Sequence, residues 1–131
     1  MGYSFNVLGL VYELLKDQKA FVTSQPTADL AQRLPALIIS SDAPQKVRNY
    51  RHPGAGAKVQ VVLTAVSEND RGAFALIDSA YSAMWDRKHE TTRWGWVSWI
   101  EEVQAPALVV SDQTAGHLFQ YQCVLNLIIR K

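Results

Sequence analysis

The stretch LFQYQCVLNLIIR, Leu118–Arg130, alternates with a period of two and predicts one long β-strand. One face of this strand is apolar throughout and consists of Phe119, Tyr121, Cys123, Leu125, Leu127 and Ile129. The other face is mixed and carries Gln120, Gln122, Val124, Asn126, Ile128 and Arg130. Because a lone strand is not stable in water, the rest of the chain must supply neighbouring strands and a cover for the apolar face.

Two amphipathic helices are predicted from apolar residues at helical spacing. The first covers residues 4–18, with Ser4 as its N-cap, and the second runs from the possible caps at 67–70 to about Arg87. Residues 19–33 are rich in loop-forming side chains and predict a loop with one short helical turn.

Further strands are predicted at 36–40, 58–66, 94–103 and 107–110. The run 36–40 is apolar and typical of a strand buried on both faces, and 58–66 follows it as the second strand of a long-armed hairpin. Helices segregated from strands that are joined by hairpin-sized links favour an α+β fold. We expect a single domain over residues 1–131, with a mostly antiparallel sheet of four to five strands and both helices packed on one face.

Composition excludes several functional classes. The chain has 131 residues, of which 48% are hydrophobic and 19% charged, so it is globular, and a net charge of +1 gives no global attraction to nucleic acid. The N-terminus lacks the basic and small-residue pattern of a signal peptide, and no apolar run is long enough to span a membrane. We therefore expect a protein of a reducing, aqueous compartment with no membrane partner.

Candidate catalytic and ligand residues are few. Cys123 falls on the apolar strand face, where a buried, inert thiol is expected, and the three histidines lie in separate loops without metal-ligand spacing. Glu101 and Glu102 are adjacent on a strand and must point to opposite faces, so they do not form an acid/base pair. No set of residues offers nucleophile, base and orienting partner together, and we predict no enzyme, no metal and no cofactor.

The tryptophans at 94, 96 and 99 form the densest aromatic segment. Trp94 and Trp96 are predicted on one strand face and Trp99 on the other, so core packing or a subunit contact is the main interpretation. The alternative is a small ligand- or nucleic-acid-binding module in which Trp94, Trp96 and Arg93 stack on bases or sugars.

The segment between the first two long strands is a projecting basic arm, at about 43–57. It contains Lys46, Arg48, Tyr50, Arg51 and His52, and it is longer than most connections inside compact domains. Such a segment is a solvated loop, a protein interface or a phosphate contact, and its composition does not choose among these.

In its order of elements the chain resembles the tail terminator proteins of long-tailed bacteriophages. The resemblance covers nearly the whole chain: the N-terminal helix, the LPALIIS strand, the long arm, the KVQVVLTAVSENDRGAFALID passage and the terminal QYQCVLNLIIRK strand. Neighbouring families of tail-completion and head-tail joining proteins share much of this architecture.

The resemblance implies a non-enzymatic virion protein at the head-tail junction, assembled in the host cytoplasm. Such a protein forms a homo-hexameric ring on the tail tube, ends tail polymerisation and offers a docking face to a head-completion or neck protein, while DNA passes through the ring without sequence-specific binding. In this family the arm contacts the neighbouring subunit or the tube, which here implicates Lys46, Arg48, Tyr50, Arg51 and His52, in contact with tube protein or DNA. The polar residues of the final strand, Gln120, Gln122, Asn126 and Arg130, are expected to face the lumen or a neighbouring subunit.

Overall fold

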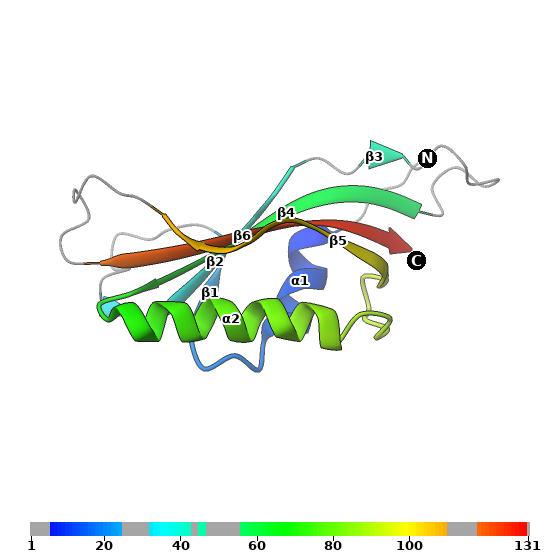
Figure 1. The fold of residues 1–131 in the computed structure, drawn as a ribbon. Helices are drawn as coiled ribbons and strands as arrows, with labels where there is room; N and C mark the ends of the chain where they lie inside the picture. Colours follow the sequence, from blue (N-terminus) through cyan, green and yellow to red (C-terminus); the bar gives the residue numbers. More distant parts are fainter. Residues whose placement is uncertain (1–5, 25–31, 43–44, 47–55, 110–117, 131) are drawn as a thin grey trace.

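A computed structural model describes residues 6–24, 32–42, 45–46, 56–109 and 118–130 (Figure 1). The described elements are, in chain order, α1 (Val7–Leu15), β1 (Phe21–Thr23), β2 (Ala36–Ser41), β3 (Gln45–Lys46), β4 (Gly56–Ser67), α2 (Asp70–Asp86), β5 (Trp96–Leu108) and β6 (Phe119–Arg130).

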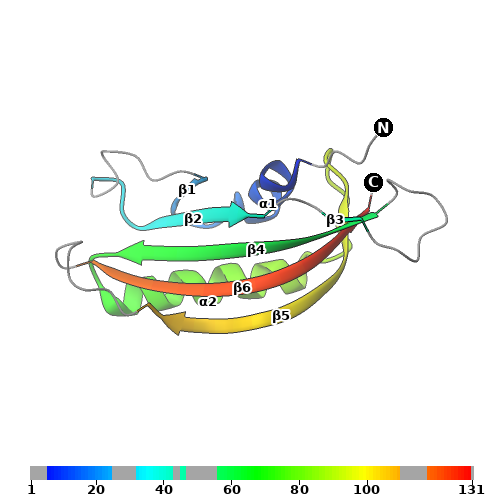
Figure 2. The same cartoon turned by 90° about the horizontal axis from the view of Figure 1, so that it is seen from above.

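All the strands belong to one sheet, in the order β1-β2-β4-β6-β5, with the short β3 paired to β4 (Figure 2). Every pairing is antiparallel except that of β1 with β2. β6 pairs with β4 over its whole length, from Phe119 opposite Ser67 to Arg130 opposite Gly56, and it pairs with β5 on its other side. The predicted α+β fold is therefore confirmed, and the final strand lies inside the sheet.

Both helices pack on the same face of the sheet (Figure 1). The core cluster joins α1 and α2 to the inward residues of β2, β4, β5 and β6, which include Cys123, Leu125, Leu127 and Ile129. Tyr121 is only partly buried against this cluster, and Phe119 is 39% exposed. The predicted apolar face is thus confirmed in its central part, but the helices do not cover its outer end.

Asparagine side chains cap both helices. Asn6 Oδ1 accepts a hydrogen bond from the Gly9 amide at 2.9 Å, and Asn69 Oδ1 accepts from the amides of Arg71 and Gly72 at 2.8 and 3.2 Å. α1 is therefore shorter than predicted and is capped by Asn6; Ser4 lies outside the described residues. The second helix has the predicted bounds within a residue.

Three details of the strand prediction are wrong. Residues 96–108 form one strand, β5, where two strands were predicted, and it continues through Pro106 because β5 is at the edge of the sheet, where a missing N–H is tolerated. A short strand, β1, lies within the predicted loop 19–33. In β2 the face of Leu37 and Ile39 is buried, whereas the other face is buried only at Ala36, half-buried at Ile38 and exposed at Ser40.

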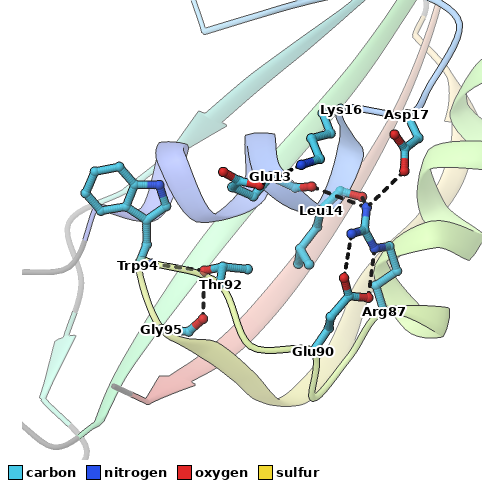
Figure 3. A network of polar contacts seen from close by, with 9 residues as sticks. All are labelled: Glu13, Leu14, Lys16, Asp17, Arg87, Glu90, Thr92, Trp94 and Gly95. Carbon is cyan, nitrogen blue, oxygen red and sulfur yellow. Dashed lines mark hydrogen bonds and ion pairs between the residues drawn. The ribbon is translucent and has the colours of Figure 1, made fainter.

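Arg87, just after α2, ties the two helices to the turn that leads into β5 (Figure 3). Its guanidinium donates to the carbonyl oxygens of Leu14 and Glu13 at 2.8 and 3.3 Å, at the unsatisfied C-terminal end of α1. It also makes a two-point contact with the Glu90 carboxylate, at 3.0 and 2.6 Å, and lies 3.7 Å from Asp17. The hydrogen bonds to Glu90 raise the pKa of Arg87 and lower the pKa of Glu90.

Replacing Arg87 by methionine is expected to lower the free energy of unfolding by about 1 to 3 kcal/mol, because it leaves helix-end carbonyls without a donor. The measurement is urea denaturation followed by circular dichroism. Lys16→Met is the matched control, since Lys16 is exposed, forms an ion pair with the partly exposed Glu13 and should change stability little. Equal effects of the two substitutions would contradict the role assigned to Arg87.

Candidate functional site

The face of the sheet opposite the helices is the first candidate surface. We call it the open face: the even-numbered residues of β6 and their cross-strand neighbours. In Figure 1 α1 and α2 both lie on the other side, so no described helix covers it. Gln120, Gln122 and Asn126 are partly exposed there and Arg130 is exposed. The predicted polar residues thus share one face of β6, together with the half-buried Ile128 and the buried Val124.

Polar contacts organise one end of the open face. Asn126 Nδ2 donates to Glu101 Oε1 at 3.0 Å, across the β5–β6 pair. Asp42 Oδ1 accepts from the Gln60 amide at 2.8 Å, and these residues with Lys58 and Asn126 line a shallow hollow of about 210 Å³. This end of the open face is therefore polar and rich in hydrogen-bonding groups.

The edge strand β5 is the second candidate surface. Trp99, Val103 and Leu108 are 56%, 50% and 52% exposed, and Glu101 and Glu102 between them are exposed too. The register of β5 against β6 shifts after Val97, after Glu102 and after Gln104. These irregularities explain why Val97 and Ile100 are both buried although a strict period of two puts them on opposite faces.

An aromatic patch continues this edge toward the N-terminus of α2. Leu108 lies opposite Tyr121, whose ring is 5.5 Å from that of Phe74, and Phe74 is 44% exposed. The Tyr121 hydroxyl donates to Asp70 at 2.8 Å, which raises the pKa of Tyr121. The exposed apolar surface of β5 therefore extends onto α2.

The tryptophans do not form one stacking platform. Trp94 precedes β5, packs partly buried against the core cluster and has the Arg93 guanidinium 5.8 Å from its ring. Trp96 contacts His89 edge-on, with ring centres 6.0 Å apart, whereas the exposed Trp99 has the Lys88 ammonium 4.8 Å from its ring. Arg93 therefore lies beside Trp94, whereas Trp96 and Trp99 have other neighbours, His89 and Lys88.

The basic arm is described only at its base. β3 pairs with β4, Gln45 opposite Lys58 and Lys46 opposite Ala57, and so lies in line with β2 on the side of β4 away from β6. Arg48, Tyr50, Arg51 and His52 lie outside the described residues. Their assignment to an interface stays a prediction.

The residues weighed for chemistry have structural environments. Cys123 is fully buried, and this burial raises the pKa of its thiol to about 12, as expected for an inert core thiol. Glu101 and Glu102 diverge as predicted: Glu101 accepts from Asn126, and Glu102 accepts from the Tyr81 hydroxyl, which raises the pKa of Tyr81. Within the described ranges, no group of three His, Cys, Asp or Glu residues could hold a metal ion. None of the helices described is long and apolar enough to cross a membrane.

Val103 and Leu108 are surface residues that the sequence assigned no role. Both residues fall within strands predicted from the sequence. Their exposure follows from the position of β5 at the edge of the sheet and from its bulges. The only local signal was Pro106, which indicates an edge strand or none.

No protein-family model and no curated protein sequence matches the chain. Among solved structures, a chain of the "Virion of native gene transfer agent (GTA) particle" has a TM-score of 0.55 with 12% sequence identity. The match covers 93% of this chain and 85% of that chain. At this identity the likeness is one of fold.

Proposed function

We propose that this protein is a structural virion protein of a phage-type particle, which caps the tail tube as a six-membered ring and ends its polymerisation. The observation that carries the proposal is the fold likeness to a chain of a gene transfer agent virion over 93% of this chain. The order of sequence elements supports the finer assignment to a tail terminator. On this proposal the protein acts at the head-tail junction, and one face of the ring binds a head-completion or neck protein.

The surfaces of the sheet suit such a ring. Closed rings of identical subunits need two different surfaces on each subunit that fit each other, and this sheet has two unlike edges. The open face, with Gln120, Gln122, Asn126 and Arg130, is polar enough to line a wet lumen that DNA passes through. Weak contacts repeated around a six-fold tube then add up to firm capping through effective concentration.

The arm is proposed to contact the tube, DNA or the neighbouring subunit through Lys46, Arg48, Tyr50, Arg51 and His52. Replacing Lys46, Arg48 and Arg51 together by glutamate is expected to leave the fold intact and to give tails of uncontrolled length, because repulsion replaces attraction at an acidic or carbonyl-rich surface. Tail lengths would be measured by electron microscopy in cells whose own copy of the gene is removed.

A matched control reverses the same amount of charge elsewhere, at the exposed residues Lys16, Lys19 and Arg71 on the helix side. If the arm variant gives assembled particles with tails of normal length, the assignment of the arm to a contact is wrong. Removal of the whole gene distinguishes the two candidate functions. Overlong tails support a tail terminator, whereas tails of normal length that do not join heads indicate another head-tail joining or neck protein.

A further inference from the structure

The edge strand β5 consists of two unlike halves. In the first, residues 96–100, the side chains of Val97 and Ile100 are buried in the core. In the second, residues 101–108, no side chain is buried, and all are exposed except the half-buried Pro106. Because burial of apolar surface is the main stabilising contribution to a fold, the second half adds little to the stability of the sheet.

The second half is also loosely attached to its neighbour. Its register against β6 shifts after Glu102 and again after Gln104, and each shift interrupts the ladder of backbone hydrogen bonds. Pro106 has no N–H to donate, and no described strand lies beyond β5 to supply other bonds. Local opening of folded proteins begins in segments of this kind, which have few buried contacts and few backbone hydrogen bonds.

Two side-chain contacts tie β5 to α2 near the boundary between the halves. The Lys88 ammonium, in the turn after α2, lies 5.3 Å from the centre of the Trp85 ring and 4.8 Å from the centre of the Trp99 ring. It is therefore within cation–π distance of one ring on α2 and one on β5. Further along β5, Glu102 accepts a hydrogen bond from the Tyr81 hydroxyl. Both contacts precede the register shift after Glu102.

We propose that β5 is a hinged edge strand and that Lys88 fixes the position of the hinge. The ammonium of Lys88 holds Trp99 against α2, so residues 96–102 stay in the sheet while residues 103–108 detach from β6. Detachment opens the backbone of residues 121–124 to solvent and makes this part of β6 the temporary edge of the sheet. The hinge is a property of the single chain and does not depend on the proposed function.

Hydrogen exchange of the full chain, resolved by residue with NMR, measures the opening without any substitution. The Val109 amide donates to the Gln120 carbonyl at 2.8 Å and reports on the far end of the second half. This amide and those of residues 103–108 that are bonded to β6 should be at least about 10-fold less protected than the bonded amides of residues 97–102. Equal protection of the two halves would overturn the inference.

Lys88→Met removes the charge and keeps a flexible apolar side chain. The bonded amides of residues 97–102 should then exchange about 3- to 30-fold faster, the change expected for the loss of a cation–π contact. Exchange in residues 103–108 should stay the same, because these residues open without help from Lys88. Lys19→Met is the matched control, since Lys19 is exposed and lies between α1 and β1. Protection of the β4 amides checks the fold of each variant.

A third variant tests whether Lys88 acts through Trp99. Trp99→Leu removes the ring, and the double variant K88M/W99L should exchange no faster in residues 97–102 than Trp99→Leu alone, because both substitutions remove the same contact. Two results would contradict the role of Lys88. One is an effect of Lys88→Met no larger than that of Lys19→Met, and the other is additive effects of the two substitutions in the double variant.

Discussion

Replacing Leu127 by alanine is expected to lower the free energy of unfolding by about 2 to 5 kcal/mol. Leu127 is fully buried in β6, between Val59 of β4 and Ile100 of β5, which are themselves buried. Truncation removes transfer free energy and leaves a cavity that neighbours held in a sheet can close only in part. Urea denaturation followed by circular dichroism measures the change.

The neighbouring residue provides the control. Ile128 is only half-buried and lies on the open face, opposite Lys58 and Trp99. Ile128→Ala removes a similar volume from a partly hydrated site, so its effect should be clearly smaller. If both substitutions lowered stability equally, the open face would have to be covered in the free subunit, and its assignment to a lumen or subunit contact would be wrong.

Gly95→Ala is expected to destabilise the protein by about 2 to 4 kcal/mol, through backbone strain and a close contact. Gly95 has φ +117°, and a Cβ there would stand 2.4 Å from the carbonyl oxygen of Arg130. Gly95 also closes the turn with Thr92, whose hydroxyl donates to the Gly95 carbonyl at 2.7 Å. The substitution must therefore displace the start of β5 from the end of β6.

Gly72→Ala is the matched control for this effect. Gly72 lies in the first turn of α2 without a positive φ, and a Cβ would stand 3.1 Å from the Ser67 hydroxyl, with its other neighbours at ordinary contact distance. A helical alanine is favoured by about 1 kcal/mol over glycine, which offsets that close approach. Thermal unfolding should show a marked loss for Gly95→Ala and little change for Gly72→Ala.

Much of the fold was predictable because its signals are local. The alternation in Leu118–Arg130 identified the buried and polar faces of β6, and the polar cluster 67–70 identified the start of α2. The divergence of Glu101 and Glu102 followed from strand geometry. These predictions need only the period of a strand or helix and the chemistry of a cap, which neighbouring residues determine.

The candidate surfaces were less predictable. The pattern of residues 94–110 indicated two strands, whereas pairing with β6 makes a single bulged edge strand and exposes Val103 and Leu108. Likewise, Arg87 was predicted only as the approximate end of the second helix, although it binds the end of α1, more than 70 residues away in sequence. Neither contact leaves a periodic signal in its own segment.

By itself, then, the sequence determined that Leu118–Arg130 is a two-faced strand within an α+β domain, because side-chain alternation is a local property of an extended backbone. Only the tertiary structure decided that this strand lies inside the sheet, with β5 as the free edge beyond it. The physical reason is that register and strand order depend on contacts between distant segments, such as the pairing of Trp99 with Ile128. The bulges in β5 then turn side chains to faces that a regular period of two would not give them.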